Sequence, residues 1–195
     1  MVRNILLIVA ALAMCGLSAC GNSSESTPTA NATSSTPQIG ATPDGAVREF
    51  LQAVKDGDHT TAEQLLTPLA REKTAEYDIA VAPPGSDTAS FEVLDVEQVA
   101  DGGAHVASQW TDIDQTGQPH TDTLVWMLRR EPEGWRIAGM GARLFPEEPP
   151  LFLNFEDPED MLRKQELAAQ EIERRMMEAQ RQAQQPDAAG ETLRQ

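Results

Sequence analysis

Three titratable side chains lie close together in the second half of the chain: Asp112, His120 and Asp122. A histidine beside a carboxylate can serve as a general acid or base, because the pKa of imidazole lies near neutral pH. These residues flank a predicted turn, where polar side chains commonly form a solvated rim. We therefore interpret them as the rim of a turn. Catalysis by a base, His120 or Asp112, is the alternative.

Aromatic side chains supply a second kind of candidate site. All nine aromatic residues lie between positions 50 and 155, so this part of the chain carries the side chains that fill cores. Tryptophan more often packs in a core than lines a ligand pocket, but both roles are open here. No catalytic residue is assigned. The candidate pocket residues are Tyr77, Trp110, Trp126 and His120.

The pattern Asp112-x-Asp114-x-Thr116-Gly117 matches the first half of a calcium-binding loop. The second half fails, because Thr123 stands where a bidentate glutamate is needed. The three histidines lack metal-ligand spacing, and the chain has no phosphate loop, dinucleotide fingerprint or hydrolase elbow. The sequence thus predicts a hairpin turn at this place, without a metal or a cofactor.

The elements that position these side chains follow from apolar periodicity. Residues 44–58 repeat apolar positions at helical spacing, and a shorter helix follows over residues 60–69. From Ser90 the period changes to two, and short turns between the segments require antiparallel neighbours. A bulge is expected near Val93. The predicted strands span residues 91–99, 104–113, 121–130 and 135–143.

This pattern predicts an α+β fold, with N-terminal helices packed on a curved antiparallel sheet of about four strands. The run from Asp44 to Asp58, the short Leu-bearing helix and the final Gly134-Trp135-Arg136-Ile137 resemble the NTF2-like superfamily over residues 44–145. The resemblance, which extends to SnoaL and ketosteroid-isomerase-like cones, implies a strongly bent sheet wrapped against helices to form a cone, and leaves open whether the cone holds a cavity. Such cones include isomerases, dehydratases and non-catalytic binding modules, so the fold alone does not set the activity. Isomerase-like members oppose a buried carboxylate to hydroxyl or acid donors, and Tyr77 does not map onto such a donor.

Two further segments follow the predicted domain. Residues 146–157 form a Pro-rich apolar connector, and Phe152 and Phe155 predict that it packs on the domain or on another chain. Residues 158–185 predict a charged amphipathic helix, with residues 186–195 as a disordered tail. We favour a solvated arm, with weak self-association and folding on a partner as alternatives. A heptad interpretation gives a thin seam of Leu162, Gln165, Ala169, Ile172, Met176, Ala179 and Ala183.

The first 19 residues have the features of a secretory signal: one positive charge, a short apolar run over residues 5–14, and a small-residue ending. Such a run reaches about 15 Å as a helix, half the hydrocarbon thickness of a bilayer. The next residues, Leu17-Ser18-Ala19-Cys20, resemble the lipobox of bacterial lipoproteins. The resemblance implies cleavage between Ala19 and Cys20 and a lipid on the sulfur of Cys20.

Residues 20–43 hold this cysteine and a Ser/Thr/Pro-rich linker with too little apolar surface to order. As a flexible chain, such a linker spans about 25 to 30 Å. The whole sequence carries 31 acidic against 15 basic side chains, a formal net charge of -16. That balance excludes nucleic acid as a partner and predicts repulsion of the domain from an anionic lipid surface.

These observations together predict a lipoprotein of the bacterial cell envelope, anchored by lipid on the extracytoplasmic side of a membrane. Its non-catalytic NTF2-like domain is expected to bind a small molecule or an envelope protein. Two alternatives remain. One is a cavity enzyme of the isomerase or dehydratase type, and the other is a scaffold that self-assembles through residues 158–185.

Overall fold

The computed structural model describes residues 39–82, 84–99, 101–114 and 116–184. The predicted signal sequence, the predicted lipid attachment at Cys20, most of the predicted linker and the predicted tail lie outside the described residues. Within the described ranges, no helix combines the length and the apolar character that crossing a bilayer requires.

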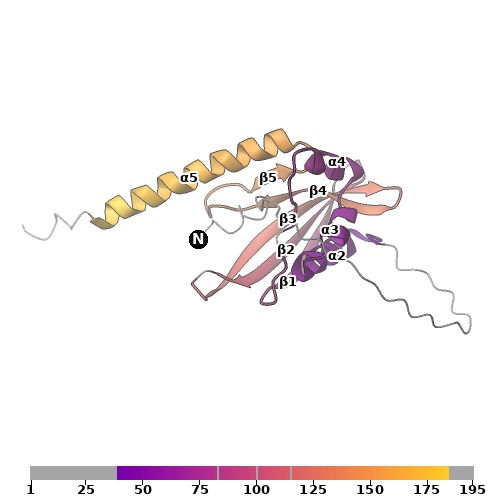
Figure 1. The fold of residues 1–195 in the computed structure, drawn as a ribbon, viewed down its shortest axis with the longest axis horizontal. Coiled ribbons are helices and arrows are strands. Elements are labelled where there is room, and N and C mark those ends of the chain that lie inside the picture. Colours follow the sequence, from indigo (N-terminus) through magenta and orange to yellow (C-terminus); the bar gives the residue numbers. More distant parts are fainter. Residues whose placement is uncertain (1–38, 83, 100, 115, 185–195) are drawn as a thin grey trace, which may run out of the picture.

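In the described part of the chain, three helices precede a sheet, and one long helix follows it (Figure 1). The sheet is antiparallel throughout, with its strands in sequence order. The predicted α+β fold is confirmed, with one strand more than the four expected. The elements are α2 (Pro43–Asp56), α3 (His59–Gln64), α4 (Pro68–Glu76), β1 (Ser90–Val99), β2 (Gly103–Ile113), β3 (Pro119–Glu131), β4 (Gly134–Ala142), β5 (Leu151–Asn154) and α5 (Pro158–Gln184).

Helix α2 begins at a threonine cap. The Thr42 Oγ1 accepts a hydrogen bond from the Gly45 N–H at 3.1 Å, and Pro43 occupies the first helical turn. Asp44 lies in the first turn of the helix, where its negative charge interacts favourably with the positive end of the helix dipole. Gly57 ends the helix with a φ of 70°, a left-handed conformation that favours glycine.

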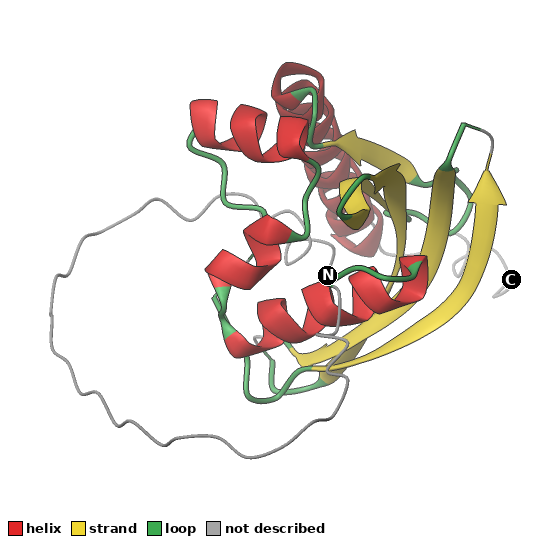
Figure 2. Ribbon diagram, turned by 90° about the vertical axis from the view of Figure 1, so that its right-hand side faces the viewer, coloured by secondary structure: helices red, strands yellow, loops and turns green. Residues whose placement is uncertain are grey.

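The core lies between α2 and the concave side of the sheet, which curves around the helices (Figure 2). Phe50 of α2 is 1% exposed, and its ring centroid lies 5.1 Å from that of Trp126 on β3. The indole N–H of Trp126 donates to the hydroxyl of the buried Ser108 at 2.9 Å. Because this polar atom has a partner, the tryptophan can lie in the core without the desolvation penalty of an unpaired N–H.

The fifth strand, β5, lies within residues 146–157, which the sequence suggested as a connector. It pairs with β4, and the backbone N–H of Phe155 donates to the Ala138 carbonyl at 2.9 Å. Phe155 is buried at 1% exposure, whereas Phe152 remains 39% exposed. The stretch therefore packs on its own domain, which was one of the two alternatives expected from these phenylalanines.

Helix α5 runs past β5 and projects beyond the sheet (Figure 1). Its buried stripe on the domain consists of Met161, Ala168 and Ile172. Of the predicted heptad seam, Ile172 lies in this stripe, while Leu162 and Met176 are exposed at 42% and 49%. The face of α5 that becomes buried is thus determined by packing against the domain, and it does not follow the heptad pattern.

Candidate functional site

Trp110, Asp112, His120 and Asp122 lie together on one face of the sheet, and we call them the hairpin site. In the β2–β3 register, Asp112 is opposite His120 and Trp110 is opposite Asp122. Residues opposite each other, and residues two apart on one strand, share a face of an antiparallel sheet. The same face continues two pairs further along to Trp126. The hairpin site is therefore the end of the concave face that lies nearest the β2–β3 turn.

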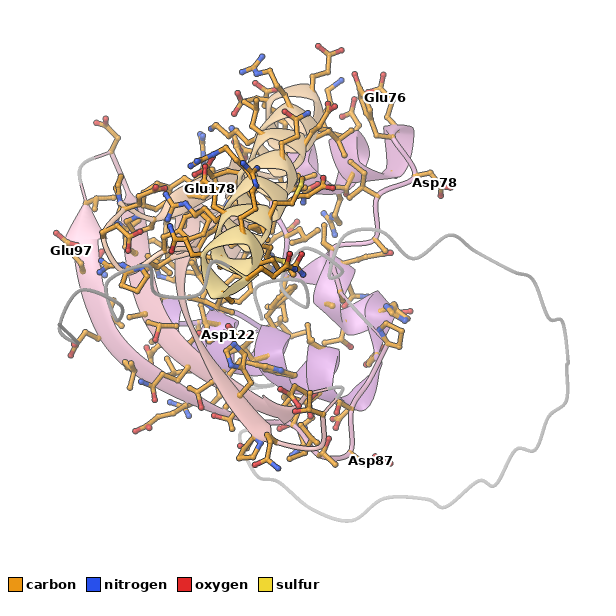
Figure 3. All side chains as sticks on the ribbon, turned by 90° about the vertical axis from the view of Figure 1, so that its left-hand side faces the viewer. Glu76, Asp78, Asp87, Glu97, Asp122 and Glu178 are labelled. Carbon is orange, nitrogen blue, oxygen red and sulfur yellow. The ribbon has the colours of Figure 1, made fainter. Side chains whose placement is uncertain are left out.

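His120 and Asp122 form the closest pair of titratable groups in this site. The His120 Nε2 lies 3.0 Å from the Asp122 Oδ1, and the side chains are 39% and 18% exposed. Burial raises the pKa of Asp122 above its ordinary value, although the contact with His120 opposes this shift. Figure 3 labels Asp122 on the sheet. The pair has the composition of an acid–base dyad.

Asp112 is held by structural contacts. Its Oδ1 accepts from the Thr88 hydroxyl at 2.5 Å and from the Ile113 N–H at 2.7 Å. Burial alone would raise the pKa of Asp112, but hydrogen bonds from Thr88, Ser86 and the Ile113 backbone outweigh this effect and lower the pKa. Asp112 thus ties the loop before β1 to the end of β2, and a low pKa makes it a weak base.

Asp114 shapes the turn that resembled half of a calcium loop. Its Oδ1 accepts from the Thr116 N–H at 2.8 Å, the Thr116 hydroxyl at 2.6 Å and the Gln118 N–H at 3.0 Å. These hydrogen bonds lower the pKa of Asp114. Across the described residues, no group of three or more His, Cys, Asp or Glu side chains is placed to hold a metal ion.

The four candidate pocket residues occupy different surroundings. Trp126 lies in the core at 4% exposure, and Trp110 stacks on Phe91 with centroids 6.2 Å apart and planes 5° apart. Tyr77 is separate from the other three, because its hydroxyl donates to the exposed Glu159 at 2.7 Å. That hydrogen bond raises the pKa of Tyr77. The structure thus brings Trp110 and His120 together and leaves Tyr77 on the far side, against α5.

Two surface hollows lie away from the hairpin site. The larger, of about 490 Å³, covers the outer side of α2 and includes Arg48, Glu49 and Asp58. The smaller, of about 250 Å³, lies beside α3 and includes His59 and Glu63. Neither hollow is lined by a residue of the hairpin site.

The start of the described chain, Ile39 and Gly40, is hydrogen-bonded to the β3–β4 hairpin, and the sequence did not predict these contacts. The Arg136 Nη1 donates to the Ile39 carbonyl at 3.1 Å, and the Trp135 N–H donates to the Gly40 carbonyl at 2.7 Å. In turn, the Gly40 N–H donates to the Glu49 Oε2 at 3.0 Å. Arg136 is 8% exposed, which is rare for an arginine without such partners. The signal available in the sequence was the arginine within an otherwise apolar strand.

Comparisons with known proteins point to partial structural likenesses. No family model matches the sequence, and neither does any curated protein. A ketosteroid isomerase-like protein from Erwinia carotovora is 20% identical at a TM-score of 0.37, over 50% of this chain and 88% of that one. The association domain of C. elegans CaMKII is 15% identical at a TM-score of 0.35, over 48% and 86%. An NTF-2 like protein of unknown function from Shewanella oneidensis is 11% identical at a TM-score of 0.33, over 47% and 88%.

Proposed function

We propose that this protein is a lipid-anchored bacterial lipoprotein whose NTF2-like domain is a non-catalytic binding module for an envelope protein. One observation carries the choice of binding over catalysis. The space between α2 and the sheet is filled by packed side chains, among them Phe50 and Trp126. Within the described ranges, the buried polar residues are Thr67, Thr74, Ser108 and Arg136, and the one carboxylate comparably enclosed, that of Glu156, is held by Thr67 and Arg129. Three of the four buried residues carry hydroxyls and the fourth a guanidinium, so the filled core presents no histidine or free carboxylate as a candidate proton carrier.

The fastening at Ile39 and Gly40 supports a tether at one end of the domain. In an antiparallel sheet the β2–β3 and β3–β4 turns lie at opposite ends of the strands. The chain before Ile39 therefore reaches the domain at the β3–β4 end, because Trp135 and Arg136 hold it there. A lipid on Cys20 would then keep the β3–β4 end toward the membrane and the hairpin site away from it.

Attachment of lipid is tested with two cysteine variants. Cys20→Ser should remove the diacylglyceryl mass and release the protein from the membrane fraction. Cys15→Ser is the matched control, since the predicted cleavage removes that residue, and it should leave both the lipid mass and the membrane fraction unchanged. Intact mass spectrometry of wild-type protein showing an unmodified Cys20, or an uncleaved leader, would contradict the proposal.

The His120–Asp122 pair favours a second candidate function, an enzyme that transfers a proton to or from a small-molecule substrate. NMR can compare the two by following exchange of the α-protons of small ketones with deuterium from the solvent. Catalysed exchange that disappears in both Asp122→Asn and His120→Gln would support the enzyme and overturn the binding module. Exchange at the uncatalysed rate, in wild type and variants alike, is the result we expect.

The filled core can be checked independently with an apolar fluorescent dye. Wild-type protein should not bind the dye, whereas Phe50→Ala should open a hollow next to Trp126 and bind it. Near-ultraviolet circular dichroism controls for loss of the fold. Binding of the dye by folded wild-type protein would show an open cavity and remove the argument against catalysis.

A further inference from the structure

Strand β1 ends the sheet on one side, and it pairs with β2 alone. One row of its backbone N–H and C=O groups therefore has no strand partner in the part of the chain that the structure describes. Three apolar side chains stand at this edge: Leu94 is 37% exposed, Val96 is 40% and Val99 is 36%. The register is interrupted between Val93 and Val96, as the sequence predicted, and is regular again from Val96 to Val99. The second half of β1 thus offers a short, regularly paired, partly apolar edge.

The stretch of sequence that forms β1 and β2 carries acidic side chains and no lysine or arginine. Between Lys73 and Arg129 the sequence has ten acidic residues and no lysine or arginine. Three of these acids, Glu92, Asp95 and Glu97, belong to β1 itself. None of the three is paired with a cation among the described residues. Figure 3 shows Glu97 at the outer margin of the sheet.

We propose that the Val96–Val99 edge of β1 binds an extended, positively charged segment of a partner protein, which adds a strand to the sheet. Backbone hydrogen bonds would provide most of the affinity, and side chains of alternating character would provide the specificity. Lysine or arginine side chains of the partner would face Glu97 on one face of the strand, and its apolar side chains would cover Val96 on the other face. The inference rests on the proposed binding function and names the surface that would carry it.

Charge decides between this partner and a second copy of the chain. Two β1 edges pairing with each other would place Glu92, Asp95 and Glu97 of one copy beside the same acids of the other. Like charges on adjacent strands destabilise a sheet, and a net charge of -16 per chain adds long-range repulsion. With a basic strand, both the contacts between adjacent side chains and the long-range electrostatic interaction become attractive. A basic segment is therefore the partner that this edge would bind.

The experiment uses the full chain in non-ionic detergent and two short synthetic peptides, one alternating lysine with valine and the other glutamate with valine. Hydrogen exchange should slow in residues 96–99 when the lysine peptide is added, and the glutamate peptide should have no effect. The triple variant Glu92→Gln/Asp95→Asn/Glu97→Gln should weaken binding of the lysine peptide by about fivefold at low salt. The matched control Glu63→Gln/Glu72→Gln/Glu173→Gln removes the same charge elsewhere and should bind like wild type.

Several results would overturn the inference. They are protection outside β1, equal binding of both peptides, an unchanged affinity in the triple variant, or no binding at all. A dimer that protects β1 without any peptide would show that a second copy is the occupant, which also contradicts the proposal. The lipid mass on Cys20 is measured separately, so a failed peptide experiment and a failed lipid anchor can be told apart.

Discussion

At one edge of the sheet β5 is four residues long and lies against α5, whereas at the other edge β1 offers ten residues without a neighbour beyond β2 in the described chain. On the β5 side, the Lys164 ammonium donates to the Phe152 carbonyl at 3.2 Å. On the β1 side, only a bulge and unpaired carboxylates restrict pairing. The β5 edge is thus covered by another element of the fold, helix α5. At the β1 edge, only features of the strand itself oppose the addition of a further strand. Of the two edges, β1 is therefore the one at which a further strand could be added to the sheet.

The closed edge depends on Glu156, whose side chain is 8% exposed. One of its oxygens accepts from the Thr67 hydroxyl at 2.8 Å, and the other pairs with Arg129 at 2.8 Å. Since Thr67 is also the cap of α4, this carboxylate joins α4, β3 and the start of α5. No contact of this kind is described at β1.

The largest effect is expected in the core that supports both edges. Phe50→Ala should lower the free energy of unfolding by about 3 to 5 kcal/mol, because it leaves a cavity beside Trp126. Urea unfolding followed by tryptophan fluorescence measures the change. Leu69→Ala, at a position 45% exposed, is the control and should change stability by less than about 1 kcal/mol. An equal loss in both variants would place the core elsewhere.

The second largest effect is expected from a substitution at Glu156, which should destabilise the β5 edge more than the β1 edge. Glu156→Ala removes a buried acceptor and leaves Thr67 and Arg129 without this partner, at an expected cost of about 2 kcal/mol. Hydrogen exchange should accelerate in β5 and the first turns of α5 more than in β1. Glu159→Ala, which loses the exposed contact with Tyr77 and one acidic charge in the first turn of α5, serves as the control. Uniform acceleration across the sheet would contradict the assignment of Glu156 to one edge.

A smaller and more local effect is expected along α5. The Arg175 guanidinium lies 3.6 Å from the Phe145 ring centroid and pairs with Glu147 and Glu148 in the segment before β5. Arg175→Ala should speed hydrogen exchange beyond residue 172 by about two- to threefold, with little change nearer the sheet. Arg174→Ala is a matched control, since its partners Glu171 and Glu178 lie within α5. The interpretation would be wrong if both variants changed exchange equally.

The smallest effect expected is a pH dependence of stability that arises from Asp122 in the hairpin site. Because burial raises the pKa of Asp122 above the ordinary 3.8, the folded state holds this proton more tightly than the unfolded state. The group therefore adds stability below the unfolded pKa, and this contribution is lost as pH rises through the raised pKa. The urea midpoint of wild type, relative to that of Asp122→Asn, should fall as pH rises from about 3 to about 7. A constant difference would show that Asp122 titrates normally.

Local chemistry was enough to predict much of the sheet. Turn residues such as Asp101-Gly102-Gly103 and the change to period two located four strands and three hairpins, and the interruption after Val93 was expected from broken alternation. The shared face of Trp110, His120 and Asp122 follows from alternation once the hairpin register is known. The burial of Asp122 does not follow, because it depends on helices and loops brought over the strand by the tertiary fold.

Long-range contacts account for what the sequence did not reveal. Strand β5 stands beside prolines and has four residues, so only its pairing with β4 makes it a strand. The buried face of α5 is set by the surface beneath it, which selects Met161 and Ala168 over the heptad positions Leu162 and Ala169. Tyr77 lies against α5 because Glu159 accepts its hydrogen bond, a contact between residues 82 positions apart.

The fastening of Ile39 and Gly40 to Trp135 and Arg136 also has a mechanical consequence. A force applied through the preceding chain would reach β4, which has strands on both sides, before it reached either edge of the sheet. Such a load would first have to break the hydrogen bonds that join Ile39 and Gly40 to Trp135 and Arg136, and it would then pass along the chain to α2. Strand β1, at the far edge of the sheet from β5, is therefore not among the first segments that such a load reaches.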